Sequence, residues 1–144
     1  MPAVIILVCL SVSWLSLSIF SWWRAIRAWR DPRYSRDVWN PLQGGPSEPV
    51  VRGHIRGLVP FAVFVSGIFG YSVGMTLGSA GGPAGRVAAD VVLASASGAV
   101  LGAVLQLTIL WFNWPRLLVL PHMRDEVGTV TARRRARNSG QSRP

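Results

Sequence analysis

The sequence predicts an all-α integral membrane protein with three transmembrane helices. Half of the 144 residues are hydrophobic and only 15% are charged, a composition that excludes a disordered chain. Three stretches of at least 20 residues lack any charged side chain. A helix rises about 1.5 Å per residue, so about 20 apolar residues cross the roughly 30 Å of hydrocarbon in a bilayer. These stretches lack the alternation of apolar and polar residues that is typical of a β-barrel strand. A water-soluble bundle is also excluded, because no amphipathic helix remains to cover these stretches.

The charge-free stretches set the predicted boundaries of a single membrane domain. The spans cover about residues 3–23, 58–77 and 91–112. Between them lie a basic cytoplasmic loop (24–57) and an outer loop (78–90). A basic cytoplasmic tail (113–144) follows, with disorder expected from about residue 127. The first span is expected to stay as an anchor, because no charge precedes it and no small-residue cleavage site follows it.

The orientation follows from the arginines. The chain has 15 arginines and no lysine, and its net charge is +9. Seven arginines lie in the loop 24–57, seven in the tail and only Arg86 in the outer loop. Because short basic loops stay in the cytoplasm, we expect the N-terminus outside and the C-terminus in the cytoplasm. Four tryptophans fall at the same predicted inner interface, which indole rings prefer: Trp22, Trp23, Trp111 and Trp114.

Small residues predict that spans two and three pack as a hairpin. Lipid provides no hydrophobic drive for helix association, so close backbone approach at small side chains supplies the contact. The second span carries a ridge with a spacing of four residues, and the third carries two such ridges side by side, the second of which is Ser95, Ala99 and Ala103. The expected helix-packing residues are Gly70, Gly74 and Gly78, with Ala94, Gly98 and Gly102. The ridges could serve this packing alone, or could also dock a partner or a second copy.

Few polar groups lie in or beside the spans. Asp90 is the only acid near one, and Arg86 precedes it by four residues, so the two could pair. Gln106 is the one strongly polar side chain well inside the third span. Asp90 and Gln106 are therefore the candidate intramembrane polar site. The serines of the first span, including Ser11 and Ser18, can bond back to their own helix, so they do not require a polar conduit.

The cytoplasmic parts favour binding to anionic lipid. The first helix is expected to continue beyond the span and to end at Asp31-Pro32. An irregular segment is expected over 32–49, with Trp39 as the large aromatic group in its middle. A short apolar run after Trp114-Pro115 is too brief to cross, and should lie on the inner surface or pack under the helices. The residues expected to bind anionic headgroups or a partner are Arg24, Arg27, Arg30, Arg133, Arg134, Arg135 and Arg137. No folded nucleic-acid module accompanies them, so a nucleic-acid partner is not expected.

Catalytic motifs are missing from the sequence. Without lysine there is neither a phosphate-binding loop nor a Schiff-base residue, and we expect His54 and His122 to be isolated, because neither forms a catalytic motif with a carboxylate or a thiol. Cys9 is the single cysteine, which excludes a disulfide within the chain. We therefore expect no enzyme activity, no cofactor and no catalytic or metal-binding residues.

These features predict a small multi-pass protein that is a non-catalytic accessory or scaffolding subunit of a membrane complex. Its partners would be membrane lipids and either a membrane protein or further copies of itself. The all-arginine basic set indicates a GC-rich genome, which favours a bacterial plasma membrane. The chain resembles phage holins of the three-span type in its size, its three spans, its outer N-terminus and its basic tail. This resemblance implies a self-assembling pore as the alternative function. The 34-residue inner loop is long for such a pore. A small ion-coupled transporter using Asp90 or Gln106 is the third hypothesis.

Overall fold

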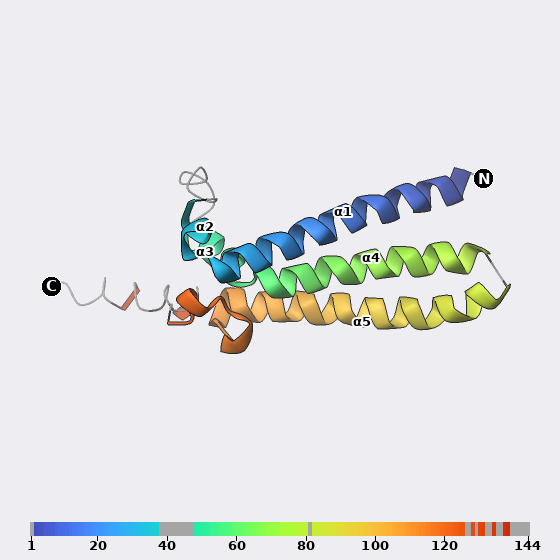
Figure 1. Cartoon of the computed structure of the whole chain (residues 1–144). Helices are drawn as coiled ribbons and strands as arrows, with labels where there is room; N and C mark the ends of the chain where they lie inside the picture. The colour runs from blue at the N-terminus through green and yellow to red at the C-terminus, as the bar shows by residue number, and fades with distance from the viewer. Residues whose placement is uncertain are drawn as a thin grey trace. The chain divides into compact units, whose positions relative to one another are not determined.

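The computed structural model describes residues 2–37, 48–80, 82–125, 128, 130–131, 134 and 137–138. In that part of the chain all regular secondary structure is helical (Figure 1). The elements are α1 (Pro2–Arg30), α2 (Pro32–Asp37), α3 (Glu48–Arg56), α4 (Leu58–Ala80), α5 (Gly82–Phe112) and the short 3-10 helices η2 (Arg116–Leu118) and η3 (Pro121–Met123). Three segments are long and apolar enough to cross a membrane: Ile5–Arg30, Leu58–Ser79 and Ala84–Phe112. The predicted all-α class and its three apolar helices of spanning length are therefore confirmed.

The segment after the first span is more helical than predicted. Helix α1 ends at Arg30, as expected from Asp31-Pro32, but a new helix, α2, begins at once. Its start is capped, because a carboxylate oxygen of Asp31 accepts a 2.8 Å hydrogen bond from the backbone nitrogen of Arg33. Pro32 suits the first helical position, where its missing N–H costs nothing. The irregular segment predicted over 32–49 is thus wrong for 32–37 and 48–49, and Trp39 lies outside the described residues.

The predicted outer loop over 78–90 is also mostly helix. Helix α4 continues to Ala80 and α5 begins at Gly82, which has a positive φ of 62°. Charged residues end an apolar run, but they do not end a helix. Residues 84–90 are rich in alanine and place Arg86 and Asp90 one turn apart, so they favour the helical state.

The chain divides into two compact units. The first contains Met1–Arg24 and Pro60–Ala103, and the second contains Ala25–Val59 and Val104–Pro144. In the first unit the α4 and α5 segments lie side by side (Figure 1). The α1 segment contacts α4 through Ser18, whose hydroxyl bonds to that of Ser66 over 2.8 Å. The outer surface of this unit's α1 segment is apolar: Ile5 and Ile19 are 63% and 62% exposed.

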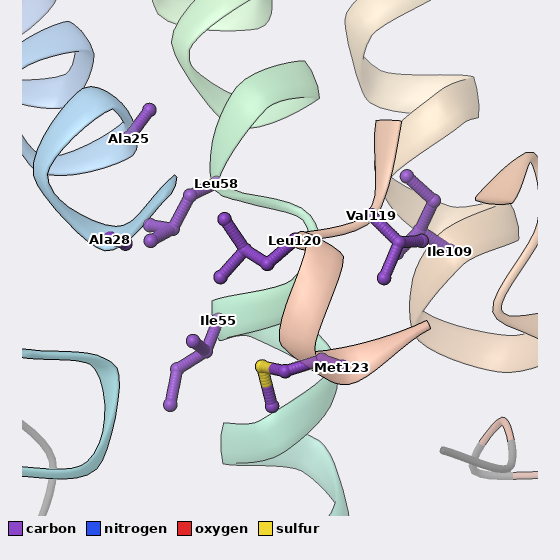
Figure 2. Packing of buried hydrophobic residues seen from close by; sticks show 8 residues of the cluster. All are labelled: Ala25, Ala28, Ile55, Leu58, Ile109, Val119, Leu120 and Met123. Carbon is purple, nitrogen blue, oxygen red and sulfur yellow. The ribbon is translucent and has the colours of Figure 1, made fainter. Parts of the chain in front are cut away.

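The second unit has its own hydrophobic core (Figure 2). Leu120 and Val119, which are fully buried, lie beside Ile109 of α5, Ile55 of α3 and Leu58 at the start of α4. The core is completed by Ala25, Ala28 and Met123. Val119 and Leu120 of the short apolar run after Pro115 therefore pack into this unit, whereas Leu117 of the same run is 80% exposed.

The chain reverses sharply where α5 ends. Asn113 adopts a left-handed conformation with φ of 57°, which asparagine tolerates better than most residues. Its backbone N–H still donates to the carbonyl of Ile109 over 3.0 Å, and its side-chain amide donates to the carbonyl of Arg124 over 3.2 Å. Gly128, inside the tail predicted to be disordered, is buried against the end of α5, where a Cβ would lie 2.5 Å from the carbonyl oxygen of Trp111.

Candidate functional site

A small-residue seam joins α4 and α5 in the first unit. The pairs that meet are Gly67 with Ala99, Gly70 with Ser95, Gly74 with Val92 and Gly78 with Ala88. Their order shows that the two segments run antiparallel. A Cβ built on Gly67 would lie 2.5 Å from the backbone nitrogen of Ala99, and one on Gly102 would lie 2.6 Å from that of Phe64. Only glycine permits this approach of one backbone to the other.

The α5 side of the seam differs from the predicted ridge. Gly102 belongs to it, but Ala94 is exposed and a Cβ on Gly98 would meet nothing within 4 Å. Residues spaced strictly by four advance about 40° around a helix at each step, whereas alternating steps of four and three stay on one face. The seam takes the second spacing, through residues 88, 92, 95, 99 and 102.

Ser66 of α4 is a polar junction with α1 in the same unit. Its hydroxyl donates to the carbonyl of Ala62 over 2.8 Å, which leaves it an acceptor for two groups of α1. The Ser18 hydroxyl donates to it over 2.8 Å and the indole nitrogen of Trp22 over 2.9 Å. The predicted back-bonding of α1 serines is confirmed at Ser11, which donates to the carbonyl of Leu7, whereas Ser18 bonds between helices.

Gln106 meets His54 in the second unit. The Gln106 amide nitrogen lies 3.3 Å from Nδ1 of His54, and both side chains are half-buried. The amide oxygen is buried without a hydrogen-bond partner and contacts the position that a Cβ on Gly57 would take. Gly57 therefore makes room for the amide. Sequence reasoning treated His54 as isolated, because nothing in the chain indicates that α3 packs against α5.

Two of the predicted arginines lie against aromatic rings. The Arg24 guanidinium of the first unit lies 5.7 Å from the Phe20 ring centre, and in the second unit that of Arg27 lies 4.7 Å from Tyr34. Both distances suit a cation–π contact. The other described members of the predicted set, Arg30, Arg134 and Arg137, are exposed, and Arg133 and Arg135 lie outside the described residues. Among the tryptophans that the structure describes, five are exposed: Trp22 and Trp23 in the first unit, and Trp29, Trp111 and Trp114 in the second.

Two further arginines of the second unit have structural roles that the sequence did not indicate. Arg56 is only 2% exposed, and its Nε donates to the carbonyl of Arg52 over 3.3 Å. Arg124 donates from Nε to the carbonyl of Val119 over 3.3 Å, and its guanidinium lies 5.9 Å from the Trp29 ring centre. Not every arginine of the basic segments is therefore available to lipid or to a partner.

Asp90 belongs to the first unit and Gln106 to the second. Asp90 and Arg86 are exposed on α5, and within the described residues neither has a salt-bridge partner. Among the described residues no three His, Cys, Asp or Glu side chains group so that they could hold a metal ion.

No family model, curated protein or solved structure matches the chain. Its class follows from the helices alone: three of them are long and apolar enough to span a membrane.

Proposed function

We propose that this chain is a non-catalytic accessory or scaffolding subunit of a membrane complex. It would cross a bacterial plasma membrane three times, with the N-terminus outside and the C-terminus in the cytoplasm. The observation that carries the proposal is that the polar side chains of the apolar helices mostly bond within the chain. Most hydroxyls of the apolar helices bond to carbonyls of their own helix, as at Ser13, Ser16, Ser72, Thr76 and Thr108.

Because these hydroxyls are already hydrogen-bonded, the main interaction that the apolar helices can offer is packing against other helices or lipid. A hydroxyl that donates to its own helix is weakly available to a passing ion or solute. The remaining polar links described above join one helix to another, through Ser66 in the first unit and Gln106 in the second. The outer surfaces of α1 and α5 are apolar. In the most apolar stretch of 18 residues in each helix, only 11% is buried inside the structure. These surfaces are available to lipid and to the helices of a partner.

Arginine and tryptophan side chains support an anchoring role at the cytoplasmic interface. Exposed indole rings prefer the headgroup region, and exposed arginines attract anionic lipid by roughly 1 kcal/mol each. Arg27 and Arg30 lie in the last turn of α1, beside the exposed Trp29. We expect the pair Arg27→Gln and Arg30→Gln to lose anionic lipid retained in native mass spectra, and the charge-preserving pair Arg27→Lys and Arg30→Lys to keep most of it.

The subunit role is tested by gentle extraction of a C-terminally tagged copy from its native membrane, followed by native mass analysis. A second protein in fixed stoichiometry supports the proposal, and the chemistry of that partner then identifies the process. Assemblies of this chain alone would contradict it and favour the pore, for which membrane conductance is the next measurement. Transport or turnover by the purified chain alone would also contradict it.

The orientation is tested with single cysteines in a Cys9→Ser background. Ser79 lies near the end of α4 and Asn138 lies in the tail, and both are exposed. An impermeant thiol reagent added to intact cells should label the Ser79→Cys variant, and should reach Asn138→Cys only after lysis. The reverse pattern would contradict the proposed orientation.

A further inference from the structure

The turn formed by residues 114–119 in the second unit has a buried side and an exposed side. Val119 is fully buried in the core, whereas Leu117 is 80% exposed and Trp114 is 64% exposed. Arg116 lies between these two and is exposed as well. The turn therefore presents a tryptophan, an arginine and a leucine outward, which are residue types that anchor a chain at a membrane interface.

The turn lies at the level of the last helical turn of α5. Asn113 reverses the chain, and Val119 then packs beside Ile109 (Figure 2). Ile109 lies about one helical turn before the end of α5 at Phe112, so the chain folds back along this apolar helix instead of continuing away from it. At this level α5 itself exposes Trp111 and Phe112, by 46% and 58%. Helix and turn thus both expose apolar surface at one end of the third apolar helix.

The backbone of the turn suits an apolar environment. The backbone N–H of Leu118 donates to the carbonyl of Pro115 over 3.2 Å. That of Val119 donates to the carbonyl of Arg116 over 3.3 Å. The carbonyl of Val119 accepts from Nε of Arg124 over 3.3 Å, and a proline has no N–H to satisfy. Because backbone groups in hydrocarbon must find their partners within the protein, these bonds lower the cost of placing the turn in lipid.

We propose that this turn enters the cytoplasmic leaflet of the membrane, with Leu117 among the acyl chains and Trp114 at the level of the headgroups. The inference rests on the proposed three-span arrangement, because it takes α5 as the third span. Acyl chains that surround the end of a spanning α5 also reach the turn beside it, so lipid covers the exposed side without a further partner. From this position the long side chain of Arg116 reaches a headgroup phosphate. The core beneath the turn is thereby held against the membrane through Val119.

The test uses the full chain with a single cysteine in the turn. Leu117→Cys is made in the Cys9→Ser background, which removes the exposed native thiol, and is labelled in detergent with a nitrobenzoxadiazole dye. The chain is then reconstituted in phosphatidylcholine vesicles that contain iodide on both sides or lipids with a nitroxide at a defined depth. We expect blue-shifted emission, strongest quenching by a nitroxide near the carboxyl end of the acyl chain, and little quenching by iodide.

Three further cysteines calibrate the depth. Leu107 is 45% exposed on α5 and lies about 7.5 Å further into the helix than Phe112, so a dye on Leu107→Cys should be quenched most by a nitroxide near the middle of the acyl chain. Trp114→Cys should be quenched most by a nitroxide on the headgroup. Asn138→Cys, at an exposed residue of the tail, should be quenched by iodide. Because Leu117 and Trp114 are largely exposed, their variants should keep the far-UV circular dichroism of wild type.

The contrary results separate this inference from the proposed function. Iodide quenching at residue 117 with lipid quenching kept at residue 107 would place the turn in water, and would overturn the inference while the span stands. Loss of lipid quenching at both residues would contradict the three-span arrangement and the inference together. Protection from iodide that appears only at a high protein-to-lipid ratio would show that a second copy covers the turn, and would overturn the inference.

The native membrane provides the last arm of the test. Leu117→Cys in a tagged chain is labelled there with a benzophenone maleimide and irradiated. Adducts of the tagged chain with lipid are the expected result. An adduct with another protein would show that a partner covers the turn, and would overturn the inference.

Discussion

Gly102 and Gly98, one turn apart on α5, give the sharpest test of the seam. The perturbation is the same at both, a change to alanine. A Cβ on Gly102 would lie 2.6 Å from the backbone nitrogen of Phe64 and 2.9 Å from the carbonyl oxygen of Pro60, whereas one on Gly98 would meet nothing within 4 Å. The obstructing atoms are backbone atoms of another helix, so no side-chain rotation relieves the clash.

The expected magnitude is the difference between the two variants. Replacing glycine by alanine inside a helix gains about 1 kcal/mol of helix propensity, and this gain is common to both. Overpacking a tight contact costs about 1–3 kcal/mol. We therefore expect the free energy of unfolding of Gly102→Ala to be lower than that of Gly98→Ala by about 1–3 kcal/mol.

The assay is equilibrium unfolding in mixed micelles, in which increasing SDS fraction is followed by far-UV circular dichroism. Gly98→Ala should unfold at the wild-type SDS fraction or above it, and Gly102→Ala at the wild-type fraction or below it, always below Gly98→Ala. Equal unfolding midpoints for the two variants would refute the reasoning, because they would show that α5 does not approach α4 closely at residue 102.

Three more substitutions test the polar links and the turn. Ser66→Ala removes the acceptor of two hydrogen bonds from α1 and should lower the free energy of unfolding by about 1–2 kcal/mol in the same assay. The control Ser72→Ala loses only a bond within its own helix and should change the free energy of unfolding by less than about 0.5 kcal/mol. Asn113→Ala should cost about 1–2 kcal/mol, since it loses both the tolerance of positive φ and the amide bond, and Asn113→Gly should cost less because it restores the conformation. Gly57→Ala should displace the Gln106 amide from His54, visible as a shifted imidazole resonance in NMR spectra; an unchanged resonance would contradict that contact.

The spans were predictable because their signal is local. A run without charge long enough to cross a bilayer predicts a membrane helix whatever surrounds it. Helix ends were less predictable, because the charges of Arg86 and Asp90 suggested that the third helix begins only after them. They end the apolar run only, and α5 extends past them to Gly82. The Asp31-Pro32 pair is a local signal for the start of α2, but it was interpreted only as the end of α1.

The contacts between helices were predictable in kind but not in register. Glycine and alanine indicated close approach, and the spacing of four offered two ridges on α5. The seam uses Ser95 and Ala99 of one ridge and Gly102 of the other, but not Ala94 or Gly98. The neighbours of Gln106 and the burial of Leu120 depend on how segments distant in the chain fold back. No pattern within either segment contains that information.

The helix contacts of the first unit differ in strength, and the difference bears on function. Glycine contacts between α4 and α5 run from Gly67 to Gly78, whereas the described hydrogen bonds from α1 meet at one hydroxyl, that of Ser66. Hydrogen bonds between membrane helices contribute only about 0.6 kcal/mol each on average. The two hydrogen bonds at Ser66 are contacts that a partner helix can match, while separating α4 from α5 would undo the whole seam. A subunit built in this way would exchange α1 contacts when it joins a complex and would keep α4 and α5 together. Ser66→Ala should therefore alter partner binding more than Ser72→Ala does, even where both variants remain folded.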